Sequence, residues 1–248
     1  MEYKYYAKSA PIETIKEHTD KLLENLEILK KEYGEKITQS IEMPEERFWQ
    51  LMKIVCKYHD AGKVFSGFQN AIRETIGEKL IPTKFNNQEI KHEQISPMFV
   101  PYKQYEMTKK ERKIVYQAIY YHHERDNKIH INSGLLEKII KEDIEPNIEK
   151  IEKELQIKIP KLSTFYLGMV EGQARITEGD ELYNEYCLIK GLLHRLDHCS
   201  SAWIEVEDET KEEIADFVEN FMKKQNFKEN DLQQFAEKNQ DKNVIIIG

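Results

Sequence analysis

Glycine and proline are scarce in this sequence, at 10 and 7 of 248 residues. Lysine, glutamate, leucine and isoleucine, most of which favour helices, dominate instead. The composition therefore predicts an all-α protein with few or no strands in its body. A chain of this length can also bury a substantial core without disulfides or structural zinc.

Cysteine is rare as well. The three cysteines, Cys56, Cys187 and Cys199, are odd in number and form no C-x-x-C pair, which argues against a secreted disulfide framework and a zinc ribbon. The first ten residues contain no apolar signal region, and no run approaches 18 apolar residues. We therefore expect a cytoplasmic protein with no membrane partner.

The sequence lacks an excess of positive charge. Its formal net charge is −8, so composition alone does not indicate a nucleic-acid partner. Acidic residues are concentrated after Glu205, however, and Lys and Arg outnumber Asp and Glu between Lys91 and Lys128. This distribution leaves room for a modest local basic surface.

Apolar residues at helical spacing predict most of the secondary structure. The first helix is expected to begin at Ile12 and to end at Gly34, and Thr108 and Glu111 form a capping-box pattern before another helix. Further helices are predicted over residues 45–60, 65–76, 182–201 and 209–224, with a surface loop over 77–91 and a charged helical pair over 128–160 that breaks at Pro146.

Seven histidines and aspartates lie on inward faces or at the ends of these helices: His18, His59, Asp60, His92, His122, His123 and Asp197. A single buried histidine is more often a core residue that bonds a carbonyl group. Seven such residues from five separate segments instead fit a binuclear metal site in the core, where one carboxylate bridges two cations. We interpret His130, His194 and His198 as surface residues.

The sequence contains three local patterns: His59-Asp60-Ala61-Gly62-Lys63 followed by Phe68-Gln69, Lys91-His92-Glu93-x-x-Ser96, and Asp197-x-x-x-Ser201. They resemble motifs of the HD superfamily of metal-dependent phosphohydrolases, and most closely those of the HD nuclease that accompanies the helicase of type I CRISPR systems. Pro97 departs from the pattern, because an uninterrupted helix is expected after Ser96.

The resemblance implies an HD-domain helical bundle that cleaves single-stranded DNA during CRISPR interference. One metal would be held by His18, His59, Asp60 and Asp197, and the second by Asp60, His92, His122 and His123. The nitrogen-rich ligand set favours Mn, Fe, Co or Ni over Mg. A helicase domain in cis or in trans and a CRISPR RNA-guided surveillance complex would be the partners.

Two further residues are candidates for catalysis beside Asp60. Lys63 could contact the phosphate or the leaving oxygen, or it could simply satisfy carbonyl groups at the end of a helix. Ser201 could contact phosphate or support a ligand, or it could be a small residue in helix packing.

Two other functions are compatible with the sequence. His122-His123-Glu124-Arg125 is similar to an H-H-E-R run in HD phosphodiesterases that act on cyclic dinucleotides or nucleotides, but no G-Y-P follows it here. The third interpretation is a helical interaction module with structural histidines, which would bind no stoichiometric metal.

The end of the chain suggests a second domain. Residues 231–239 read as a short helix, and residues 243–248 read as a β-branched strand ending in Gly248. Such a strand is typical of the entry to a phosphate-binding loop. We therefore expect an HD nuclease domain over residues 1–225 and, over 226–248, a linker and the first strand of a helicase domain or a C-terminal tail.

Overall fold

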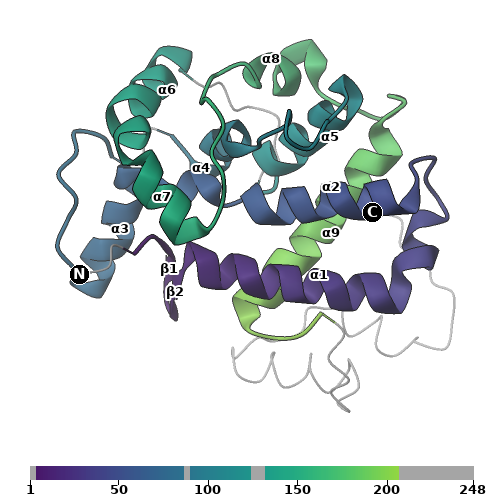
Figure 1. Cartoon of the computed structure of the whole chain (residues 1–248), viewed down its shortest axis with the longest axis horizontal. Helices are drawn as coiled ribbons and strands as arrows, with labels where there is room; N and C mark the ends of the chain where they lie inside the picture. Colours follow the sequence, from purple (N-terminus) through teal and green to yellow (C-terminus); the bar gives the residue numbers. More distant parts are fainter. Residues whose placement is uncertain (1–3, 87–89, 124–131, 207–248) are drawn as a thin grey trace, which may run out of the picture. The chain divides into compact units, whose positions relative to one another are not determined.

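The computed structural model describes residues 4–86, 90–123 and 132–206, and these belong to one compact unit, Met1–Glu207 (Figure 1). Helices dominate this unit, which confirms the predicted all-α class. The α-helices are α1 (Ile15–Thr38), α2 (Glu45–Tyr58), α3 (Ser66–Ile76), α4 (His92–Ile95), α5 (Lys109–Tyr120), α6 (Ser133–Ile139), α7 (Ile148–Leu155), α8 (Leu167–Val170) and α9 (Tyr183–Ala202).

Shorter turns connect these helices. The 3₁₀ turns are η1 (Ala61–Val64), η2 (Ser96–Phe99), η4 (Glu145–Asn147) and η5 (Gly172–Ala174), and η3 (Ile140–Ile144) is a π-helical turn. The break predicted at Pro146 falls within η4. The predicted elements over 209–224, 231–239 and 243–248 lie outside the described residues.

The core forms where the apolar faces of the longest helices meet. Helix α1 packs against α2 and α9, and α5 packs against α2, α8 and α9 (Figure 1). Fully buried side chains from each of these helices fill the space between them, among them Leu22, Phe48, Val55, Val115 and Leu193. Because α2 contacts α1, α5 and α9, the residues at its C-terminal end lie in the middle of the bundle.

The first helix begins three residues later than the sequence predicts. Ile12–Thr14 forms strand β2, which pairs antiparallel with β1 (Tyr6–Ser9). Thr14 is the N-cap of α1 and exchanges a capping box with Glu17, so the helix cannot extend into the strand. Ile12 matches the helical spacing of α1 but is 58% exposed.

The prediction that Gly34 ends the first helix is wrong, since α1 continues to Thr38. A Cβ atom at Gly34 would lie 3.2 Å from Oε1 of Glu45 and 3.6 Å from Nε1 of Trp49, two residues of α2. The glycine therefore serves a close approach of two helices and not a left-handed turn.

Pro97 lies two residues after the end of α4, in the tighter turn that follows this helix. After Ile95 the backbone tightens into η2, and Pro97 occupies one of the first positions of that turn, where a missing N–H costs little. The helix expected after Ser96 is thus replaced by a 3₁₀ turn.

None of the described helices is long and apolar enough to cross a membrane.

Gly62 lies at the closest contact between η1 and α4. Its N–H donates to Oγ of Ser96 at 2.9 Å, and that hydroxyl donates to the carbonyl of His92 at 2.9 Å. A Cβ atom at Gly62 would lie 2.1 Å from the carbonyl oxygen of His92 and 2.8 Å from the amide of Ser96. Only glycine allows η1 and α4 to lie this close together.

We predict that Gly62→Ala lowers the free energy of unfolding by about 3 kcal/mol, because backbone atoms must move to admit the methyl group. Gly191→Ala is the matched control: it lies within α9 with no atom within 4 Å of the added Cβ. That variant should gain up to about 1 kcal/mol from helix propensity. Urea unfolding measures both, and equal effects would contradict the close approach at Gly62.

Candidate metal centre

The structure brings all seven of the predicted metal-ligating residues close together, although His123 is exposed, contrary to the inward face predicted for it. His59 caps the end of α2, Asp60 follows it, and His18 and Asp197 project from α1 and α9. The other three come from the start of α4 and from the residues after α5: His92, His122 and His123. Five segments that are far apart in the sequence thus contribute to one cluster.

Asp60 lies between two sets of histidines and is almost completely buried. Its Oδ2 atom is 3.6 Å from Nε2 of His18 and 3.4 Å from Nε2 of His59. Its Oδ1 atom is 3.2 Å from Nε2 of His92 and 3.8 Å from Nε2 of His122. The two oxygens of one carboxylate therefore face two different pairs of imidazoles.

Two sets of ligand atoms are close enough to hold a metal ion each. Asp60, His92, His122 and His123 form one set, and His18, His59 and Asp60 form the other. Asp197 borders the second set, with Oδ1 2.9 Å from Nε2 of His18.

Hydrogen bonds to backbone carbonyls orient two of the imidazoles. Nδ1 of His59 is 2.9 Å from the carbonyl oxygen of Cys56, and Nδ1 of His122 is 2.6 Å from that of Ile119. When each Nδ1 donates, Nε2 carries no proton, and its lone pair is free to bind at the centre of the cluster. Within the described residues, Nε2 of His59, His92 and His122 and Oδ1 of Asp60 are buried without a hydrogen-bond partner.

Such buried acceptors are costly unless something binds them, and neutral imidazoles with a shared carboxylate are good ligands for divalent transition metals. The residues present therefore fit a metal-binding role. In that role each Nε2 supplies a lone pair, and the Asp60 carboxylate supplies negative charge.

Burial keeps two of these imidazoles, His92 and His122, neutral. Burial lowers the pKa of His92 to about 4, although Asp60 opposes the shift. Burial and the neighbouring His123 hold the pKa of His122 well below its ordinary value. Both rings are therefore unprotonated at neutral pH, which is the state that binds metal.

The carboxylates are held in their charged form. Burial alone would raise the pKa of Asp60, but the Lys63 ammonium and the adjacent His59 hold it well below its ordinary value. Burial likewise opposes the ionisation of Asp197, and the nearby His18 and His59 outweigh it, so its pKa is lowered. Burial would lower the pKa of His59, but Asp60 and Asp197 raise it.

Lys63 is positioned by the turn that follows Asp60. Its Nζ donates to Oδ2 of Asp60 at 2.7 Å and lies 5.7 Å from the centre of the Phe68 ring. Gln69 fixes this turn to the N-terminal hairpin: its Nε2 donates to the carbonyl of Lys63 at 2.7 Å and to that of Tyr6 at 2.9 Å. The ammonium group thus lies directly beside the carboxylate at the centre.

Ser201 is exposed, and its carbonyl oxygen accepts a hydrogen bond from Nζ of Lys8 at 3.0 Å. The buried serine in this turn is the preceding Ser200, whose Oγ accepts from the side chain of Asn25. The catalytic role of Ser201 stays a prediction. His198 is exposed and His194 is partly exposed, with their rings stacked; His130 lies outside the described residues.

Sequence analysis missed Glu13, a buried carboxylate in β2. Its Oε2 is 3.4 Å from Nδ1 of His18, and Lys8 and Lys21 form ion pairs with it at 2.7 and 2.6 Å. Lys21 and Lys8 outweigh its burial and lower its pKa, so it stays ionised beside His18. An acidic residue just before the Thr14 capping box was the available signal.

The fold and the site define a helical domain of the HD class, in which an adjacent histidine and aspartate belong to a cluster of side chains able to hold a metal ion. The family model described as "Cas3, HD domain" matches residues 22–245. The chain therefore belongs to the Cas3 HD domain family. Membership implies a CRISPR-associated, nuclease-type function, as the sequence motifs predict.

A solved structure shares this fold. The CRISPR-associated Cas3 HD domain protein from Methanocaldococcus jannaschii superimposes with a TM-score of 0.51 and 20% sequence identity, covering 78% of this chain and 98% of that one. At this identity the likeness supports the fold and not the individual residues. No curated protein matches the sequence.

We predict that the metal-free protein loses stability as the pH falls from 6.5 toward 4. The unfolded histidine binds a proton near pH 6.5, whereas His92 resists protonation until about pH 4, so acid favours the unfolded chain. His92 alone contributes at most about 1.4 kcal/mol per pH unit in this window.

Urea unfolding of chelator-treated protein at several pH values measures this slope. His92→Gln should flatten it, because glutamine does not titrate. If the variant and the parent chain show the same slope, the neutral state assigned to His92 is wrong.

Proposed function

We propose that this chain is a metal-dependent nuclease that hydrolyses phosphodiester bonds in single-stranded DNA during CRISPR interference. The observation that carries the proposal is the position of Asp60, whose two oxygens face separate pairs of imidazoles. Family membership supports the nuclease class.

In this proposal His18, His59, Asp60 and Asp197 hold one divalent ion, and Asp60, His92, His122 and His123 hold the other. When bound, two such ions supply an activated water and neutralise charge on the attacked phosphodiester. The nitrogen-rich donor set favours Mn, Fe, Co or Ni over Mg.

Three residues of the chain have further roles in this proposal. Asp60 fixes the spacing of the two ligand sets, and the Lys63 ammonium lies where it can donate to a phosphate oxygen or to the leaving oxygen. The Glu13 carboxylate lies 3.4 Å from Nδ1 of His18, and a carboxylate beside a metal-bound imidazole commonly strengthens metal binding. The partners we propose are a helicase domain, in cis or in trans, and a CRISPR RNA-guided surveillance complex.

Removal of metal should abolish cleavage of labelled single-stranded DNA, because the donor set cannot activate water without a cation. Adding back Mn, Co or Ni should restore the activity, and ATP should not be required. A cyclic dinucleotide serves as the alternative substrate in the same assay. Full activity after rigorous chelation would refute the mechanism, and cleavage of the cyclic dinucleotide alone would favour a phosphodiesterase.

Asp60→Asn should abolish cleavage and reduce the bound metal, because it removes charge that both ligand sets share. Lys63→Ala should keep the metal and slow cleavage by roughly 10²–10³-fold, the usual effect of removing one donor to developing charge. Metal content by mass spectrometry and single-turnover rates separate the two effects. An Asp60→Asn protein with full metal and near-normal rate would contradict the bridging role.

Glu13→Gln should weaken metal binding by roughly 10–100-fold, since it removes the charged partner of the His18 imidazole. Glu24→Gln, an exposed substitution on α1, is the control and should bind metal like the parent chain. Calorimetric titration with Mn²⁺ compares them. Equal affinities would show that Glu13 serves only its ion pairs with Lys8 and Lys21.

A further inference from the structure

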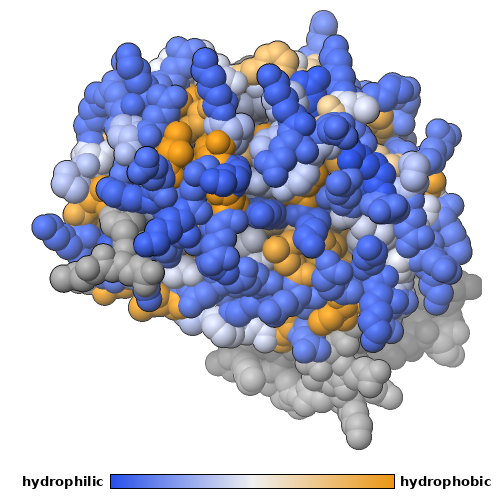
Figure 2. Space-filling model, viewed as in Figure 1, coloured by the Kyte–Doolittle hydropathy of each residue, from blue (hydrophilic) through white to orange (hydrophobic). Residues whose placement is uncertain are grey.

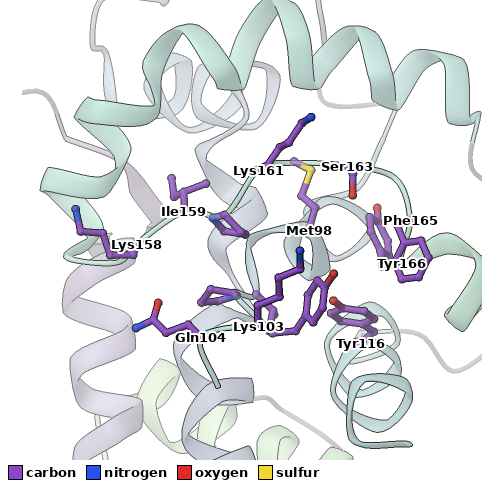
Figure 3. Close-up of a pocket in the computed structure, with 14 residues that line it drawn as sticks. Met98, Lys103, Gln104, Tyr116, Lys158, Ile159, Lys161, Ser163, Phe165 and Tyr166 are labelled. Atoms are coloured by element: carbon purple, nitrogen blue, oxygen red, sulfur yellow. The ribbon is translucent and has the colours of Figure 1, made fainter. Parts of the chain in front are cut away.

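A second hollow, apart from the metal centre, lies beside the segment that follows α4 (Figure 3). Its volume is about 590 Å³, within the range of small-molecule sites. Residues 98–104 and 158–166 form two of its walls, and Tyr116 from α5 completes it. The hollow is large enough to admit one aromatic ring with its substituents.

Aromatic rings line one side of this pocket. Figure 3 shows Tyr116, Phe165 and Tyr166 grouped together, opposite Lys158, Ile159 and Gln104. Tyr116 and Tyr166 are buried, whereas Phe165 is 60% exposed. A phenylalanine this exposed gains little from the protein core, but its free face can stack on a flat ligand.

Positive charge surrounds the same pocket. Lys103, Lys158 and Lys161 line it, and none of its described lining residues is acidic. This is unusual in a chain with 45 acidic and 37 basic residues. Lys158 lies 3.6 Å from Glu152, which is not part of the lining, and in Figure 3 Lys103 extends into the space between the two walls.

The face shown in Figure 2 is mainly hydrophilic, and its apolar residues form small patches between charged side chains. A hollow that combines aromatic rings with several ammonium groups suits a ligand that is both flat and anionic.

The pocket is joined to the metal centre through α4. The Tyr166 hydroxyl donates to the carbonyl of Gln94, which lies two residues after His92 in the same short helix. Met98, which lines the pocket, belongs to the η2 turn that follows directly. One continuous segment, His92–Phe99, therefore contributes residues to both places.

We propose that this pocket binds a nucleotide of the single-stranded substrate, at a position away from the bond that is cut. A base would stack on the exposed face of Phe165, and the flanking phosphates would contact Lys103 and Lys161. The inference rests on the proposed nuclease function and specifies how that substrate is held. Duplex DNA keeps its bases paired and stacked, so only a single strand can present one to the pocket.

Binding to metal-free protein tests the proposal without cleavage. The probe is fluorescein-labelled oligothymidine of roughly 20 nucleotides, longer than the ~4–16 nucleotides that single-strand sites cover. Anisotropy should show that Phe165→Ala binds roughly tenfold more weakly, since one stacked base is lost. The pair Lys103→Glu and Lys161→Glu should weaken binding at least as much and reduce the salt slope by roughly 0.7 per lysine.

Matched exposed residues outside the pocket provide the controls. Leu80→Ala removes an apolar side chain that is 50% exposed, and Lys31→Glu reverses a charge whose side chain is 82% exposed on α1. Both should bind the oligonucleotide like the parent chain. If Phe165→Ala does not fold, the lysine pair carries the test alone.

Hydrolysis of bis(p-nitrophenyl) phosphate by the metal-loaded protein separates this proposal from the nuclease proposal. That small diester reaches the metal centre without spanning the pocket, so the pocket variants should hydrolyse it at the parental rate. Unchanged oligonucleotide affinity in both pocket variants, or no binding to the parent chain, would overturn the pocket assignment.

The other outcomes are equally distinct. If poly-glutamate binds and loses affinity in the pocket variants while oligothymidine does not, the pocket takes an acidic peptide and the proposal is wrong. If oligothymidine binds through the pocket but no metal supports its cleavage, the proposed nuclease function fails and the binding site stands.

Discussion

The buried carboxylate of Asp60 is the constraint on which the rest of the site depends. An ionised group at the centre of a helical bundle is costly unless charges and donors surround it. Lys63 supplies one cation at 2.7 Å, and imidazoles from α1, α2, α4 and the end of α5 supply the remaining neighbours. The helices therefore do more than pack: their ends must converge on a single carboxylate.

Small residues and polar contacts outside the cluster allow this convergence. Gly62 lets the 3₁₀ turn after Asp60 lie against α4, and Ser96 links the two through one hydroxyl. Gln69 joins the same turn to the hairpin. These motif residues are not candidate ligands, and their contacts hold in place the turn that follows Asp60.

Composition predicted the helical class. Periodicity predicted the inward faces of His18, His59 and His122, because helical spacing determines which side chains share a face. It could not place Ile12 in a strand, because three residues fit either period, and it misread Gly34, because close packing between helices leaves no local signal. Glu13 was missed for a related reason. Its partner His18 is near in sequence, but the hairpin that turns the carboxylate toward it is set by contacts with Gln69 and α3.

The position of the hairpin bears on how this domain is delimited. The match to the family model begins at residue 22, within α1, whereas β2 and the first turn of that helix precede it. A fragment cut at the family boundary would lose the His18 imidazole, the Glu13 carboxylate beside it and the strand that Gln69 holds. Residues outside the matched range therefore contribute to one of the two sets of candidate metal ligands.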